Sequence, residues 1–172
     1  MENYTCCFLG HRTVNETDEL RTKLTDTVEK LITQENVDTF LFGSNSRFDR
    51  LCLELVTRLK EKYPRVKRIY VRAEFPCISD DYLAYLLKSY DDTYYPAQLH
   101  GAGRASYVER KYEMINNSKY CVVYYDNSRA PAARRSGTKI ALDYALKKGK
   151  EIIPLCGTVP PVQVAATVSL RP

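Results

Sequence analysis

Apolar positions along the chain follow two alternating periods, which predicts strands alternating with helices. Short apolar runs at residues 4–9 and 39–42 are typical of buried strands. Each run is followed by a segment in which apolar residues recur every three or four positions, as on one face of a helix, at residues 16–34 and 48–59. A third strand at residues 68–73 completes a β-α-β-α-β order. This order predicts a parallel sheet with right-handed crossovers.

The second half of the chain continues the alternation after one unassigned segment. The pattern predicts helices at residues 80–90, 105–117 and 137–148, and strands at 119–125 and 151–156. Residues 91–103 are rich in Tyr, Pro and Gly, typical of an ordered excursion or a lid, and receive no assignment. We therefore predict one α/β domain over residues 1–156, with about five or more strands. Residues 157–172 show no amphipathic period and are expected to form a flexible tail.

Sequence signals for helix starts are of two kinds. Thr13 and Glu16 have the spacing of a capping box, which predicts a helix beginning at residue 16. Asp18 and Glu19 would favour the positive end of that helix dipole. The first helix is therefore expected to be capped by the Thr13–Glu16 pair.

Composition narrows the class of protein. A hydrophobic fraction of 44% and a charged fraction of 27% are ordinary for a globular domain, and no apolar run approaches the roughly 20 residues of a membrane helix. Six cysteines without a C-x-x-C pair, and no visible secretory signal, predict reduced thiols in a cytoplasmic protein. With two histidines we expect no zinc site, and we predict no cofactor. The net charge of +5 favours anionic ligands but does not indicate nucleic-acid binding.

Polar turns close three of the predicted strands or open the helix that follows. They consist of Gly10, His11 and Arg12; Gly43, Ser44, Asn45 and Ser46; and Ser136, Gly137, Thr138 and Lys139. The carboxyl ends of parallel strands meet at one edge of a sheet, where open α/β sheets bind ligands. Glycine permits close approach of a phosphate, while hydroxyl groups and a helix N-terminus hold its charge. The turns therefore predict an anion site.

Each candidate residue also has a structural interpretation. Ser46 is an anion contact, a helix N-cap, or both. Asp49 is either a first-turn partner of the helix dipole or an acceptor for a ribose hydroxyl. His11 either binds the ligand or supports the turn. Arg12 either binds an anion through its guanidinium or is an ordinary surface residue.

Two basic residues precede the fourth predicted strand. Arg110 and Lys111 lie on a helix whose far end could reach over the sheet edge. The alternative is a solvated face in which they pair with Glu109 and Glu113 on the same helix.

Taken in order, these motifs resemble the SLOG superfamily, which includes the LOG proteins, the DprA/Smf proteins and the YpsA-like DUF1273 branch. The resemblance covers residues 4–155 and is strongest to the YpsA-like branch. It is carried by four segments: Gly10-His-Arg12, Gly43 with Asp49, Arg110-Lys-x-x-Met114, and Ser136-Gly-Thr138. It implies a Rossmann-like three-layer fold that binds nucleotides or nucleotide-derived ligands, including signalling nucleotides, and it implies self-association into a homo-oligomer.

The resemblance leaves binding and catalysis as alternatives. LOG enzymes cleave the N-glycosidic bond of nucleoside 5′-monophosphates with a helix Arg, matched by Arg110, and a Glu, whose position is occupied by Ala141. A carboxylate stabilises the cation-like sugar in such reactions, and alanine cannot. We therefore predict a binding module that acts as a sensor or sequesters its ligand. The alternative is an N-glycosidase with a displaced carboxylate, for which Glu109, Glu113 or Asp49 is the candidate. A DNA-handling role like that of DprA is disfavoured by the modest charge.

Overall fold

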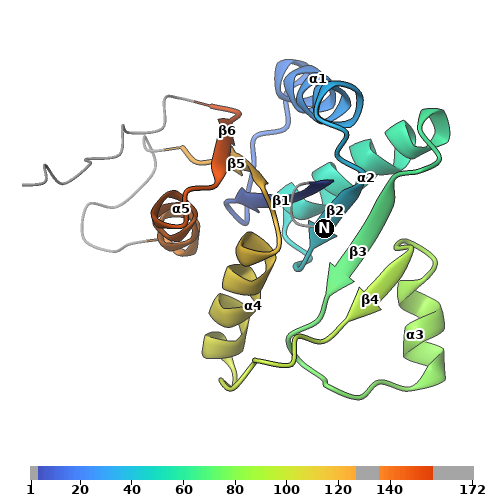
Figure 1. The fold of residues 1–172 in the computed structure, drawn as a ribbon, viewed down its shortest axis with the longest axis vertical. Coiled ribbons are helices and arrows are strands. Elements are labelled where there is room, and N and C mark those ends of the chain that lie inside the picture. Colours follow the sequence, from blue (N-terminus) through green and yellow to red (C-terminus); the bar gives the residue numbers. More distant parts are fainter. Residues whose placement is uncertain (1–3, 127–135, 157–172) are drawn as a thin grey trace, which may run out of the picture.

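The computed structural model describes residues 4–126 and 136–156. Their six strands form one sheet in the order β4-β3-β2-β1-β5-β6, and every neighbouring pair is parallel. The strands are β1 (Thr5–Gly10), β2 (Thr39–Phe42), β3 (Lys67–Val71), β4 (Asp92–Tyr94), β5 (Tyr120–Tyr124) and β6 (Glu151–Pro154). The helices are α1 (Asp18–Gln34), α2 (Arg47–Lys62), α3 (Asp80–Leu86), α4 (Arg104–Asn116) and α5 (Gly137–Lys147). The predicted Rossmann-like α/β fold is confirmed (Figure 1).

Alternating side chains of the central strand β1 divide the core into two layers. Cys6 and Phe8 face one apolar cluster, to which α1, α2 and α3 contribute. Cys7 and Leu9 face a second cluster, built with α4 and α5. Figure 1 shows α1 and α4 on opposite sides of the sheet. Because both faces are covered, the inner strands are apolar on both sides, as their continuous apolar runs predict.

The order of the strands reverses at one point of the sheet. From β1 the chain moves outward through β2 and β3 to β4, and α4 then carries it back to β5 on the other side of β1. In sheets of this kind, ligands bind outside the carboxyl ends of the strands near such a reversal. The fold therefore directs attention to the ends of β1, β5 and their neighbours.

The segment 91–103 that the sequence pattern left unassigned contains β4. It pairs in parallel with β3, with Ile69 opposite Asp92 and Val71 opposite Tyr94. The strand is only three residues long and lies at the edge of the sheet. Such a short strand cannot display a recognisable alternation of apolar and polar residues, so its hydrogen bonds to β3 define it.

The predicted capping box at the start of α1 is wrong. The helix begins at Asp18, and the N-cap is Thr17, whose side chain accepts a hydrogen bond from the backbone nitrogen of Leu20. Glu16 instead forms ion pairs with Arg21 and Arg47, at 3.4 and 3.0 Å. Asp18 does lie in the first turn, as predicted. A second threonine one residue beyond Glu16 therefore provides the cap.

The predicted tail at residues 157–172 falls outside the described residues, as do residues 127–135. Within the part of the chain that the structure describes, no helix is long and apolar enough to cross a membrane.

Candidate functional site

Hydrogen bonds join the loops that follow β1, β2 and β5. The backbone oxygen of Arg12 accepts from the backbone nitrogen of Arg47, the first residue of α2, at 3.0 Å. Nε2 of His11 accepts from the backbone nitrogen of Asp126, just after β5, also at 3.0 Å. These two contacts bring the carboxyl ends of three strands to one edge. The side chain of Arg12 itself is exposed there.

Gly10 leaves room for an aromatic ring beneath the end of β1. A Cβ atom at Gly10 would overlap the ring of Phe48 and come within 2.6 Å of Cε1. The Phe48 ring is fully buried and stacks on Tyr124 with a centroid distance of 5.6 Å. Gly10 therefore permits α2 to pack against the ends of β1 and β5.

His11 bridges the two strands between which the strand order reverses. Its ring lies 5.3 Å from that of Tyr125 and is partly buried. Burial lowers the pKa of His11, against the opposing charge of Asp126. Because Nε2 accepts a hydrogen bond from Asp126, the ring is neutral in this arrangement. His11 thus supports the turn, whatever further contact it makes.

Acidification is expected to weaken the folded state through His11. The pKa of His11 in the folded protein is lower than the ordinary value of about 6.5. The contribution of neutral His11 to the free energy of unfolding is therefore complete above that pH. It is lost as the pH falls from about 6.5 towards the folded-state pKa. Urea unfolding at pH 7.5 and pH 5.5 measures this loss. The loss should shrink in His11→Gln and persist in His100→Gln, and equal losses in all three proteins would contradict the assignment.

The turn after β2 is held by a buried carboxylate. Oδ2 of Asp49 accepts hydrogen bonds from the backbone nitrogen of Ser44 at 2.9 Å and from its hydroxyl at 2.7 Å. Ser46 is the N-cap of α2, with its hydroxyl accepting from the backbone nitrogen of Asp49. Asp49 is 4% exposed. Its carboxylate therefore shapes the turn, while Asn45 points to solvent from it.

Arg110 is buried, which rules out the solvated-surface alternative for this residue. Arg110 is 6% exposed. Nε is enclosed and has no hydrogen-bond partner within the described residues, and no ion pair of Arg110 is present there. The guanidinium carbon lies 5.2 Å from the ring centroid of Tyr107, at cation–π distance. Arg110 thus brings a buried positive charge to the sheet edge, and within the described residues that charge has no ion-pair partner.

Gly43 lets α4 rest directly on the turn after β2. A Cβ atom at Gly43 would lie 2.7 Å from Sδ of Met114 and 3.0 Å from Nε of Arg110. The Tyr70 side chain, at the end of β3, lies within reach of the same charges. Burial raises the pKa of Tyr70, Arg110 lowers it, and Asp49 raises it slightly. The predicted residues Gly43, Asp49 and Arg110 therefore share one neighbourhood.

Replacing Gly43 with alanine is expected to force α4 away from the turn. Overpacking of this kind costs about 1–3 kcal/mol, so we expect a loss of that size in the free energy of unfolding. Denaturant unfolding measures it. Gly137→Ala is the matched control, because a Cβ atom at Gly137 meets nothing within 4 Å. Equal stability of the two variants would contradict the close packing of α4 on Gly43.

The N-terminus of α5 carries the third predicted turn. The hydroxyl of Ser136 is the N-cap and accepts from the backbone nitrogen of Lys139. Gly137 is exposed and Thr138 is 9% exposed. Nζ of Lys139 lies 2.6 Å from a carboxylate oxygen of Asp143. The ammonium group of Lys139 is thus already paired within its helix.

Carboxylates that could replace the missing catalytic Glu have structural partners. Oε2 of Glu109 accepts from the backbone nitrogens of Gly101 and His100, both at 2.9 Å, and these donors lower its pKa. Oε1 of Glu113 accepts from the side-chain amide of Asn117 at 2.8 Å. Asp49 holds the turn described above. Ala141 is 2% exposed and packs in the second apolar cluster, so no charged group fits there without rearrangement.

Sequence reasoning missed Tyr70 and Glu74, and it noted Tyr107 only as part of the helix motif with Arg110 and Met114 that resembles the YpsA-like branch. The hydroxyl of Tyr107 donates to Oε1 of Glu74 at 2.7 Å, which joins the first turn of α4 to the loop after β3. No glycine follows β3, so that loop gave no sequence signal. Its position beyond the end of a predicted strand is the only feature that could have pointed to it.

Comparisons with known proteins give little beyond the architecture. No protein-family profile matches the chain, and no curated protein matches it. Among solved structures, the chain is similar to S. aureus TarJ in complex with NADPH, with 15% identity and a TM-score of 0.41. The similarity covers 82% of this chain and 46% of TarJ, so this chain spans less than half the length of that protein. A likeness this distant does not bear on the ligand.

Proposed function

We propose that this chain binds a nucleotide or a nucleotide-derived ligand at the carboxyl edge of its sheet, as a sensor or a sequestering module. The observation that carries the proposal is the buried guanidinium of Arg110, without an anionic partner among the described residues. A buried charge that lacks a partner is costly to the folded state, and a bound anion would offset that cost. Phosphate is a natural partner because guanidinium binds it through paired hydrogen bonds.

The positions of two of the three turns support a phosphate subsite. Arg12 extends from the end of β1, and the Gly43–Ser46 turn lies beside Arg110. In the proposed complex the phosphate contacts Ser136, Gly137 and Thr138 at the start of α5, where the helix dipole favours negative charge. Arg12 and Arg110 would then share the neutralisation of the ligand.

Kinship with the SLOG superfamily, and with its YpsA-like branch in particular, is part of the proposal. It rests on the order of the motifs, and the Rossmann-like fold is consistent with it. Hydrolysis of a glycosidic bond receives no support from the geometry, because Asp49, Glu109 and Glu113 all hold other groups of the chain. We therefore propose binding, and we expect no free base to be released from AMP, CMP or NAD.

Isothermal titration calorimetry against nucleotides tests the proposal. The panel contains AMP, CMP, NAD and cyclic nucleotides, and adenosine serves as the control that lacks phosphate. We expect at least one nucleotide to bind, and AMP to bind at least tenfold more tightly than adenosine, because a charge-assisted hydrogen bond contributes about 1.5–3 kcal/mol. Absence of binding across the panel, or equal affinities for AMP and adenosine, would refute it.

A further inference from the structure

We infer that the surface where the loop after β3 meets the first turn of α4, next to Arg110, contains a base-recognition subsite for a purine that bears an amino group, formed by Glu74, Phe75 and Tyr107. The inference rests on the function proposed above and specifies the ligand class. It assigns stacking to the two aromatic rings and hydrogen bonding to the Glu74 carboxylate.

The three residues come from two elements that meet at the sheet edge. Glu74 and Phe75 follow β3, and Tyr107 lies in the first turn of α4. The hydrogen bond from the Tyr107 hydroxyl to Oε1 of Glu74 fixes the two elements relative to each other. In Figure 1, the loops after β3 and β4 both run between α4 and α3. The subsite would lie along these loops.

The aromatic ring of Tyr107 connects this subsite to the buried charge. The guanidinium carbon of Arg110 lies 5.2 Å from the centroid of the Tyr107 ring, and Tyr107 itself is 40% exposed. A planar base could therefore stack on the ring while its phosphate reaches the guanidinium.

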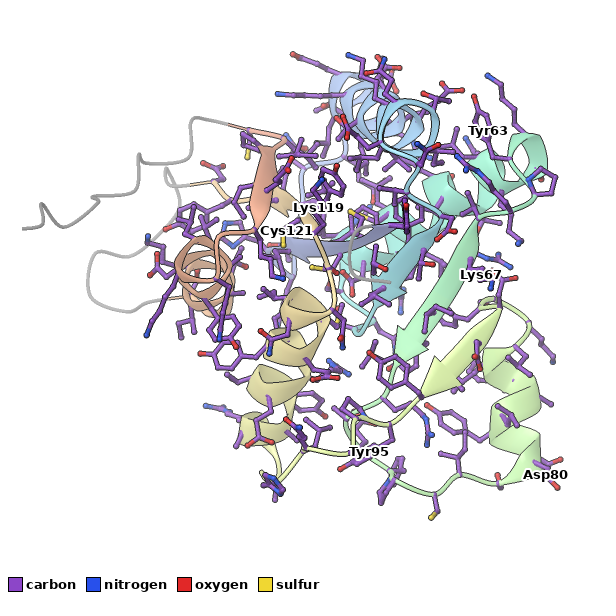
Figure 2. The ribbon with its side chains drawn as sticks, viewed as in Figure 1. Tyr63, Lys67, Asp80, Tyr95, Lys119 and Cys121 are labelled. Carbon is purple, nitrogen blue, oxygen red and sulfur yellow. The ribbon has the colours of Figure 1, made fainter. Side chains whose placement is uncertain are left out.

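A small hollow lies next to the carboxylate. It is lined by Tyr70, Arg72, Ala73, Glu74, Phe75 and Tyr82. The guanidinium of Arg72 donates to the backbone oxygen of Phe75 at 2.8 Å and holds the rim of the hollow in place. The Phe75 ring is 56% exposed at this rim. Figure 2 shows many side chains between α4 and α3, with Tyr95 labelled after β4 and Asp80 labelled at the start of α3.

The Glu74 carboxylate and the exposed aromatic rings determine which base this subsite would favour. A carboxylate accepts hydrogen bonds and donates none, so it favours an amino group over a carbonyl oxygen. Oε1 is engaged by Tyr107, and Oε2 has no hydrogen bond within the residues described. Two exposed aromatic rings favour the larger face of a purine. An adenine or guanine nucleotide fits these requirements better than a uridine nucleotide.

Calorimetry with three ligands separates this inference from the proposed function. The ligands are AMP, purine riboside 5′-monophosphate, which lacks only the amino group, and ribose 5-phosphate, which lacks the base. We expect AMP to bind about tenfold more tightly than the purine analogue. The purine analogue should in turn bind more tightly than ribose 5-phosphate. If all three bind equally, the base subsite is refuted and the anion site stands. If none binds, the proposed function itself fails.

Variants assign the discrimination to individual groups. Glu74→Gln should bring the AMP and purine-analogue affinities close together while ribose 5-phosphate binding is unchanged. Tyr107→Phe should keep the advantage of the purine analogue over ribose 5-phosphate, and Tyr107→Leu should remove it. Tyr85→Leu, at an exposed tyrosine of α3, is the control and should change nothing. If Tyr107→Phe and Tyr107→Leu reduce the advantage of the purine analogue over ribose 5-phosphate equally, the ring of Tyr107 does not stack on a base.

Discussion

Arg110→Met is expected to abolish nucleotide binding and at the same time to stabilise the unliganded protein. Removing the guanidinium removes the charge that attracts the phosphate, so the dissociation constant should rise at least about 30-fold, in line with the roughly 2–5 kcal/mol lost when one member of a buried charge pair is removed. Calorimetry measures this effect, with ribose 5-phosphate and AMP as ligands.

The gain in stability follows from the burial of Arg110. Apolar replacements of buried ions are often stabilising by about 1–4 kcal/mol, although the cation–π contact with Tyr107 is lost and offsets up to ~2 kcal/mol. We expect a net gain of about 1–2 kcal/mol, which raises Tm by about 2–8 °C in a protein of this size.

Arg58→Met is the charge-matched control for both measurements. Arg58 lies on α2, where its side chain is 66% exposed and pairs with Glu54 four residues earlier. An exposed ion pair contributes little to stability, so neither Tm nor affinity should change much. If Arg110→Met lowers Tm, or binds nucleotide as the original protein does, then Arg110 has a structural role and the proposed site is wrong.

Gly10→Ala is expected to produce the largest loss of stability among alanine substitutions at the glycines that the structure describes. The new Cβ atom would overlap the fully buried ring of Phe48, which is itself stacked on Tyr124. Close packing leaves the ring nowhere to move, so we expect a cost of about 3 kcal/mol, at the upper end of measured overpacking effects. Differential scanning calorimetry should show Tm lowered by about 6–12 °C.

A double-mutant cycle shows whether Phe48 is the cause. Gly10→Ala should cost clearly less in a Phe48→Leu background than in the original protein, because the smaller side chain relieves the overlap. Additive effects of the two substitutions would mean that the methyl group meets another obstacle, and an unchanged Tm in Gly10→Ala would contradict the packing at the end of β1.

Periodicity predicted most of the architecture because most elements are long enough to display it. The α1 helix has buried Leu20, Leu24 and Val28 at helical spacing, and β1 is an unbroken apolar run. By contrast, β4 has only three residues, and hydrogen bonds to Ile69 and its neighbours define it. The start of α1 depended on a choice between Thr13 and Thr17, and local spacing favoured the wrong one.

The candidate site was predictable only where a local signal exists. Gly10 and Gly43 both follow strands, so they stood out as places where the backbone needs space. That Phe48 and Met114 fill this space depends on how α2 and α4 pack, which the sequence does not display. The burial of Arg110 was hidden for the same reason, since an Arg-Lys pair with neighbouring glutamates has the composition of a solvated helix face.

The contact between Tyr107 and Glu74 illustrates the same limit over a longer distance. The two residues are separated by 33 positions and belong to different elements. Their meeting follows from the return of the chain through α4 across the sheet edge. Tyr107 shares a helix motif with Arg110, but no motif accompanies Glu74, so the contact of Glu74 with this helix follows from the tertiary structure alone.

Nitrogen-15 NMR of the arginine side chains tests the central claim, that Arg110 holds a buried charge ready for an anion. The Nε–H signal of Arg110 is assigned by its disappearance in Arg110→Met, and AMP is then titrated into the labelled protein. We predict that this signal shifts in proportion to the fraction bound, while that of Arg58 stays in place. An Arg110 signal that does not move while AMP binds, or the absence of any binding, would contradict the claim.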